Sequence, residues 1–161
     1  MPTHYFSNSA CPDSVPQPSV FLAGPSPRRV EDASWRPVAL ERFADAADLA
    51  LFIPEWDMGL PLADYDRQIR WEWKHLDACT AILFWVPRKS PVFPGFTTNV
   101  EFGHYLAKRP DRVIYGRPPE AEKVKYLDEL YRHATGREPL TDLAATCDAA
   151  RELCRRFAPS A

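Results

Sequence analysis

Glu101 is an acidic side chain in a position where it could act on a bound ligand. It follows a loop that contains Gly95 and two threonines, and this loop follows the apolar residues 80–86. A carboxylate at the carboxyl end of a parallel strand faces the crevice where open α/β sheets bind ligands. Such a group suits a nucleophile toward a sugar carbon. Thr98 and Glu101 also have the spacing of a capping box, in which the acid only begins a helix, so the spacing leaves both roles open.

Strands and helices that alternate along the chain must position this acid. Four short apolar segments predict strands at residues 19–23, 51–53, 80–86 and 112–115. Helices are predicted at about residues 34–50, 64–78, 98–108, 121–134 and 141–157. The alternation predicts an α/β fold, a flavodoxin-like or Rossmann-like three-layer sandwich with a parallel sheet of four to five strands and helices on both faces. In the strand order 2-1-3-4, the loops after the first and third strands converge on one crevice.

Composition indicates one globular domain and leaves small ligands possible. The chain has 161 residues, of which 45% are apolar, and we expect an irregular arm at residues 1–18 and a single domain at residues 19–161. A net charge of −2 gives no basic surface for a nucleic-acid polymer. The longest apolar run, residues 79–86, is too short to span a membrane. No signal-peptide pattern begins the sequence, so we expect a cytoplasmic protein.

Cysteines and histidines give no sign of a metal site. The four cysteines lack the paired spacing of zinc ligands, and the four histidines are scattered along the chain. We therefore expect reduced structural thiols, no metal and no cofactor.

Two short motifs resemble a known family. Residues 21–25, Phe-Leu-Ala-Gly-Pro, are followed later by residues 99–103, Asn-Val-Glu-Phe-Gly. In this order they are similar to the nucleoside 2-deoxyribosyltransferases, whose relatives include 2'-deoxynucleoside 5'-monophosphate N-glycosidases. The resemblance covers about residues 19–116, and Trp71-Glu72 with residues 84–88 is similar to a bacterial branch of the family.

The resemblance implies that Glu101 is a nucleophile at the anomeric carbon. Its carboxylate would displace the base and form a covalent 2-deoxyribosyl-enzyme, which a second base or water then releases. The positive end of the following helix is expected to keep the carboxylate ionised, an effect of about 0.3–1 kcal/mol. Glu72 takes the place of an aspartate that helps to protonate or orient the leaving base in related enzymes. The alternative for Glu72 is a solvated helix acid that pairs with Arg67 or Arg70.

Further residues of the two motif regions are candidates for substrate contacts. The motifs and the loop between the third strand and Glu101 contribute Gly24, Pro25, Gly95, Thr97, Thr98 and Asn99. The threonines offer hydroxyl and backbone N–H groups to a sugar or phosphate, or they simply begin the helix.

One position departs from the family pattern. Gly95 stands where many members carry an aspartate, six residues before the nucleophile. Asp57 could supply the missing carboxylate, with Trp56 as a surface for stacking a base, although Trp56 could equally anchor its loop in the core. Arg28 or Arg88 could hold a 5'-phosphate through two hydrogen bonds, and both could equally be surface arginines.

The sequence thus predicts cleavage or transfer at the N-glycosidic bond of 2'-deoxyribonucleosides or their 5'-monophosphates. The partner is a small nucleoside or nucleotide, and the resemblance implies a homodimer or higher homo-oligomer. Transfer and hydrolysis share one covalent intermediate, so residue types do not separate them. The missing acid at Gly95 favours an alternative, a nucleotide-binding or sensing module with weak or no catalysis. A third possibility is an unrelated α/β protein in which Glu101 caps a helix.

Overall fold

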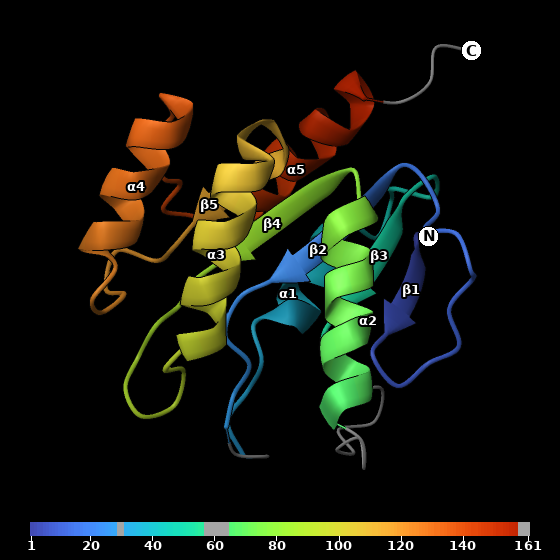
Figure 1. Cartoon of the computed structure of the whole chain (residues 1–161), viewed down its shortest axis with the longest axis horizontal. Coiled ribbons are helices and arrows are strands. Elements are labelled where there is room, and N and C mark those ends of the chain that lie inside the picture. Colours follow the sequence, from blue (N-terminus) through green and yellow to red (C-terminus); the bar gives the residue numbers. More distant parts are fainter. Residues whose placement is uncertain (29–30, 57–64, 158–161) are drawn as a thin grey trace.

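A parallel sheet of five strands forms the centre of the protein (Figure 1). The computed structural model describes residues 1–28, 31–56 and 65–157. The strands are β1 (Thr3–Phe6), β2 (Ser19–Ala23), β3 (Ala50–Ile53), β4 (Ala81–Trp85) and β5 (Val113–Gly116). Their order is β1-β3-β2-β4-β5, so the four expected strands lie in the predicted order, with β1 added at the edge. The predicted flavodoxin-like sandwich is confirmed.

Strand β1 corrects the expectation of an irregular N-terminal arm. It pairs in parallel with β3, with Thr3 opposite Ala50, and the ring of Tyr5 stacks on Phe52 with the centroids 5.2 Å apart. A four-residue edge strand that is half exposed has almost no apolar pattern of its own. It forms because the free edge of β3 offers hydrogen-bonding groups and a ring to pack against.

Helices cover both faces of the sheet. One face carries α1 (Arg36–Arg42) and α5 (Leu143–Arg156), and the other carries α2 (Tyr65–Ala78), α3 (Phe96–Lys108) and α4 (Lys125–Thr135). A short 3-10 helix, Pro110–Arg112, leads into β5. Strands β2, β3 and β4 are buried at every residue, as expected for strands that are covered on both faces.

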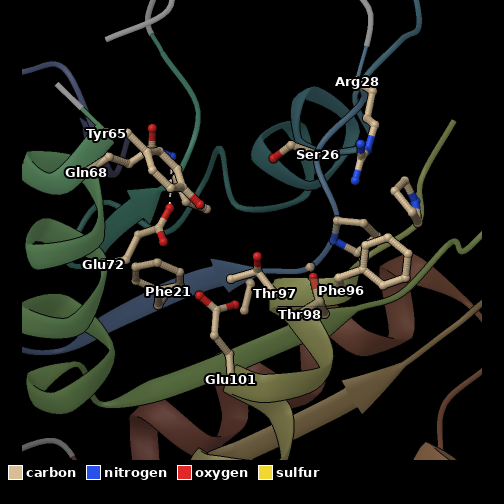
Figure 2. Close-up of a pocket in the computed structure, with 16 residues that line it drawn as sticks. Phe21, Ser26, Arg28, Tyr65, Gln68, Glu72, Phe96, Thr97, Thr98 and Glu101 are labelled. Atoms are coloured by element: carbon tan, nitrogen blue, oxygen red, sulfur yellow. Dashed lines mark hydrogen bonds between the residues drawn. The ribbon is translucent and has the colours of Figure 1, made fainter. Parts of the chain in front are cut away.

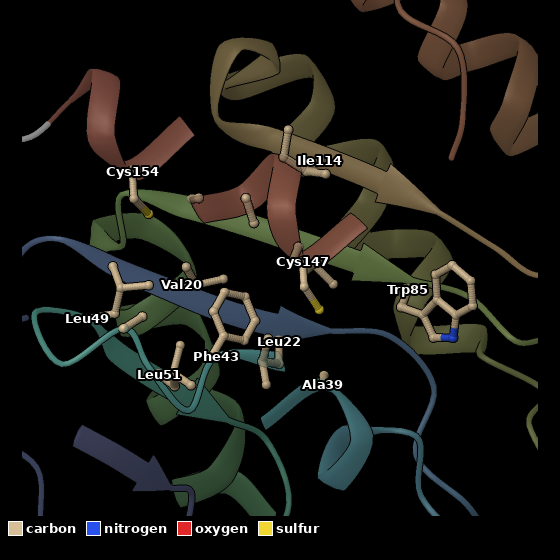
Figure 3. Packing of buried hydrophobic residues seen from close by; sticks show 14 of the residues in the cluster. Val20, Leu22, Ala39, Phe43, Leu49, Leu51, Trp85, Ile114, Cys147 and Cys154 are labelled. Atoms are coloured by element: carbon tan, nitrogen blue, oxygen red, sulfur yellow. The ribbon is translucent and has the colours of Figure 1, made fainter. Parts of the chain in front are cut away.

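The two faces bury separate apolar cores. Figure 3 shows the core beneath α1 and α5, where Phe43 and Cys147 pack near Val20 and Leu22 of β2. Cys79 lies in the other core, and the cysteine thiols are free, in keeping with structural thiols. None of the helices in the described residues is long and apolar enough to cross a membrane.

Helix α1 is shorter than predicted. The pattern indicated a helix over about residues 34–50, but α1 ends at Arg42 and the chain reaches β3 through turns. Phe43, Ala46 and Leu49 are buried in these turns. Their apolar spacing resembles a helical face because turns that pack on a core also bury every third or fourth residue.

Candidate active site

A cleft opens at the carboxyl end of β2, between the first turns of α2 and α3 (Figure 2). This is the crevice predicted by the strand order, where the loops after β2 and β4 converge. The cleft is lined by Phe21, Ala23, Gly24, Pro25, Ser26, Arg28, Pro54, Tyr65, Gln68, Glu72, Pro94, Gly95, Phe96, Thr97, Thr98 and Glu101.

Glu101 lies in the second turn of α3, and its side chain points into the cleft. The helix begins at Phe96, and its N-cap residue Gly95 has a φ of 64°, in the left-handed region that glycine favours. A capping box at Thr98 and Glu101 would make Thr98 the N-cap residue and Asn99 the first residue of the helix. Because the helix begins at Phe96, three residues earlier, and its N-cap is Gly95, the capping role is wrong and Glu101 is left facing the cavity.

Glu72 enters the same cleft from α2. Figure 2 shows the carboxyl groups of Glu72 and Glu101 pointing toward one another across the cavity. Gln68, one turn earlier on α2, donates a hydrogen bond from Nε2 to Oε1 of Glu72 at 2.9 Å. Glu72 is therefore a partly buried acid held by an amide rather than a solvated acid on the outer face of its helix.

Burial changes the ionisation of both acids. It raises the pKa of Glu101 from 4.5 to about 8, and the negative charge of Glu72 adds to the rise while Arg36 opposes it. Burial also raises the pKa of Glu72, against the hydrogen bond from Gln68 and the charge of Arg36. The change at Glu101 corresponds to roughly 5 kcal/mol. It exceeds the helix-dipole effect of about 0.3–1 kcal/mol, so the expectation of an ionised Glu101 in the free protein is wrong.

The loop after β2 forms one wall of the cleft. Gly24 has a φ of 140°, and a Cβ atom at this position would overlap the carbonyl oxygen of Trp85. Only glycine therefore fits here without a shift of the backbone. Farther along the loop, Arg28 is exposed at the rim, with its guanidinium carbon 5.9 Å from the centroid of the Phe96 ring. Of the predicted binding residues, the cleft therefore brings together Gly24, Pro25, Arg28, Gly95, Thr97 and Thr98.

Three other predicted binding residues, Arg88, Asn99 and Trp56, do not line the cleft. Arg88 is only 7% exposed, and it donates hydrogen bonds to Oδ1 of Asn99 and, at 3.0 Å, to the carbonyl oxygen of Lys123. Arg88 and Asn99 thus tie the first turn of α3 to the loop before α4. Trp56 is partly buried away from the cleft lining, with its indole nitrogen shielded from solvent. Asp57 lies outside the described residues.

Several lining residues were not among the predicted catalytic or binding residues. These are Phe21, Ala23, Ser26, Pro54, Tyr65, Gln68, Pro94 and Phe96. Gln68 had a usable signal, because a residue four positions before an acid on a helix lies beside it. Tyr65 and Phe96 had no usable sequence signal, because a single exposed aromatic side chain at the start of a helix does not belong to a periodic apolar pattern.

This arrangement can carry out acid–base and nucleophilic chemistry on one ligand. Two carboxyl groups with raised pKa values face one cavity, so one can hold a proton near neutral pH while the other attacks. No group of three histidine, cysteine or acidic side chains in residues 1–28, 31–56 and 65–157 is arranged to hold a metal ion.

Comparison with known proteins points to one family. A family model described as "Nucleoside 2-deoxyribosyltransferase like" matches residues 17–119, more than half of the chain. The matched segment runs from just before β2 to just beyond β5 and contains every residue that lines the cleft. A search of curated proteins gave no significant match.

Proposed function

The chain belongs to the nucleoside 2-deoxyribosyltransferase-like family, and from this premise we propose that it cleaves or transfers at the N-glycosidic bond of 2'-deoxyribonucleosides or their 5'-monophosphates. The observation that carries the proposal is the pair of acids, Glu101 on α3 and Glu72 on α2, that enter one cleft from two helices. Retaining cleavage of a glycosidic bond needs two carboxyl groups with different roles.

Glu101 is the nucleophile in this proposal. Its carboxylate attacks C1' of the sugar while the bond from C1' to the base nitrogen breaks, which leaves a 2-deoxyribosyl ester on the enzyme. The transition state resembles an oxocarbenium ion. A 2-deoxy sugar suits this step because no electron-withdrawing 2'-hydroxyl opposes the developing positive charge.

Glu72 supplies the proton for the departing base. The reactive form holds one proton on the pair, with Glu72 protonated and Glu101 ionised. Because the two groups interact, their titrations belong to the pair. The proton passes from Glu72 to the base nitrogen as the glycosidic bond breaks. In the second step a new base or a water molecule attacks C1', the Glu101 ester bond breaks, and the attacking group returns a proton to Glu72.

The rim of the cleft suits the other parts of a nucleotide. Arg28 is exposed beside the cleft, and its guanidinium can bind a 5'-phosphate through two parallel hydrogen bonds. Tyr65 and Phe96 are 63% and 72% exposed at the starts of the two flanking helices, where an aromatic base can stack on them. In this proposal Arg28 distinguishes monophosphates from nucleosides.

We also propose that the domain of residues 19–161, with β1 as its edge strand, works as a homodimer or higher homo-oligomer. Support comes from large apolar side chains that are exposed on α2 and α3, the two helices that flank the cleft. Besides Tyr65 and Phe96, Trp73 is 60% exposed and Val100 is 72% exposed. Large exposed apolar patches mark interaction surfaces.

A second candidate is a nucleotide-binding or sensing module with weak or no catalysis. Two observations favour it. Gly95 provides no carboxylate at the position where many members of the family carry one, and burial keeps Glu101 mostly protonated near neutral pH in the free protein. A protonated carboxyl group binds ligands well but is a poor nucleophile.

A substrate panel separates these candidates. The protein is incubated with deoxynucleosides and deoxynucleoside monophosphates, with and without a free acceptor base, and the products are resolved by chromatography. Base exchange identifies a transferase, and free sugar identifies a hydrolase. Ligand binding without product supports the sensing module.

Two variants test the nucleophile. Glu101→Gln should abolish turnover and leave the fold intact, whereas the matched variant Glu41→Gln, exposed on α1, should retain it. Equal turnover in Glu101→Gln and the wild type would eliminate the proposed nucleophile.

A further inference from the structure

Arg36 is a buried cation beside the cleft that sequence analysis did not single out. It is the first residue of α1 and is only 1% exposed. A guanidinium removed from water is tolerated only when its donors are satisfied. Nε donates to the carbonyl oxygen of Leu22 at 3.0 Å, and Nη2 donates to that of Gly24 at 2.7 Å. Nη1 donates to Oγ of Ser26 at 3.0 Å and to Oε1 of Glu55 at 2.6 Å.

The oxygens that Arg36 binds belong to two separate segments at the cleft. Leu22, Gly24 and Ser26 lie at the end of β2 and in the loop that follows, and Glu55 follows β3. Gly24 and Ser26 line the cleft. One side chain therefore ties a wall of the cavity to the end of the neighbouring strand.

The two residues before Arg36 hold the same segments. The hydroxyl group of Ser34 donates to Oε1 of Glu55 at 2.8 Å, and Nε1 of Trp35 donates to the carbonyl oxygen of Pro25 at 3.1 Å. Residues 24–27 of the loop after β2 are Gly-Pro-Ser-Pro, and the two prolines leave this segment few backbone N–H groups with which to hold itself. Its conformation is held by side chains at the start of α1.

Arg36 also supplies positive charge to the acids. Its charge favours the ionised forms of both Glu72 and Glu101, whereas Glu72 opposes ionisation of Glu101. The charged and titratable groups around Glu101 come from α1, α2, α3 and the loops after β2 and β3: Arg28, Arg36, Glu55, Tyr65, Glu72 and Tyr105. Arg36 is the cation among these groups whose charge favours ionisation of both acids.

We infer that Arg36 is a positioning residue of the active site: it clamps the Gly24–Ser26 wall of the cleft to the end of β3 and places a fixed positive charge near Glu101 and Glu72. The inference rests on the proposed function for its effect on turnover. Its geometric part concerns the free protein, because the four hydrogen bonds are made without a ligand.

Two substitutions separate the clamp from the charge. Arg36→Lys keeps the charge but cannot span four acceptors, and Arg36→Met removes both. Arg42→Met, at the exposed end of α1, is the matched control. Three quantities are measured: backbone amide exchange at Gly24 and Ser26, titration of the Glu101 carboxyl carbon by NMR, and kcat and KM against pH.

Arg36→Lys should speed amide exchange at Gly24 and Ser26 at least tenfold and lower kcat about tenfold to a hundredfold, while Glu101 titrates near its wild-type pH. Arg36→Met should move the Glu101 titration to higher pH by about one unit or more, and the pH dependence of kcat/KM should move with it. Arg42→Met should change none of these quantities.

Unchanged exchange and kcat in Arg36→Lys would overturn the clamp, and an unchanged Glu101 titration in Arg36→Met would overturn the role of the charge. If Arg36→Met does not fold, Glu55→Ala and Ser26→Ala remove single bonds of the clamp, and normal exchange in both would also overturn it. If the wild type turns over no nucleoside, the proposed function fails, and amide exchange and the NMR titration still decide the inference.

Discussion

Replacing Glu101 by glutamine should stabilise the protein at alkaline pH while it removes activity. The carboxyl group has a pKa of about 8 in the folded protein and 4.5 as its ordinary value. Between these values the folded state binds more protons at this site than the unfolded state, so the free energy of unfolding falls as pH rises. Glutamine has the same shape and does not titrate, so the variant lacks this loss.

The size of the effect follows from the two pKa values. At pH 5 the folded state is protonated at Glu101, whereas most unfolded chains have already lost this proton, so the carboxyl group lowers the free energy of unfolding by about 1 kcal/mol. At pH 8 the unfolded state has lost its proton, and the decrease reaches at most about 4 kcal/mol. Relative to the wild type, Glu101→Gln should therefore gain roughly 3 kcal/mol between these two conditions.

Urea unfolding at pH 5, 6, 7 and 8 measures this difference. Comparing the variant with the wild type at each pH cancels the titration of all other groups to first order, and Glu41→Gln controls for the loss of one negative charge. A difference that does not change with pH would show that the Glu101 carboxyl group is not buried in the folded protein. The placement of the acid inside the cleft would then be wrong.

Three further predictions concern the cleft. Glu72→Gln should slow departure of a neutral base by about 10²- to 10⁴-fold. It should also move the rise of kcat/KM with pH to lower pH than in the wild type, because the charge of Glu72 raises the pKa of Glu101; a pH–rate profile that does not move would contradict the coupling. Arg28→Ala should raise KM for a 5'-monophosphate by about tenfold to a hundredfold and leave KM for the nucleoside unchanged in steady-state assays. Equal effects on both substrates would refute phosphate binding by Arg28. Gly24→Ala should lower the free energy of unfolding by about 2 kcal/mol or more, since the added carbon overlaps the Trp85 carbonyl oxygen; a urea midpoint equal to that of the wild type would contradict the tight passage.

The sequence predicted the central strands and their order well because burial on both faces leaves a direct local signal. The uninterrupted apolar residues of β2 and β4 indicated covered parallel strands, and each is buried at every residue. It did not predict β1, whose four residues are stabilised by pairing with β3 across a long stretch of chain. The motif around Glu101 likewise indicated the acid and the family, because the motif is a local pattern that does not depend on which residues surround the acid in the fold.

The roles of the arginines depended on tertiary contacts. Arg88 follows β4 closely enough to suggest a phosphate ligand, yet its guanidinium binds Asn99 and the carbonyl oxygen of Lys123. Arg36 resembles an ordinary surface residue at a helix start, yet it is buried against oxygens from two loops. Residue type determines how many hydrogen bonds a guanidinium can donate, and only the fold determines which oxygens lie within reach.

The amino-acid sequence by itself determined the strands β2, β3, β4 and β5, which acid follows the apolar run, and which family the motifs resemble, because these features depend on residues close together along the chain. Only the tertiary structure decided that Glu101 and Glu72 share one cavity and that burial holds a proton on Glu101 near neutral pH. The physical reason is that solvent exclusion and charge–charge energy depend on distances between helices that are far apart in sequence.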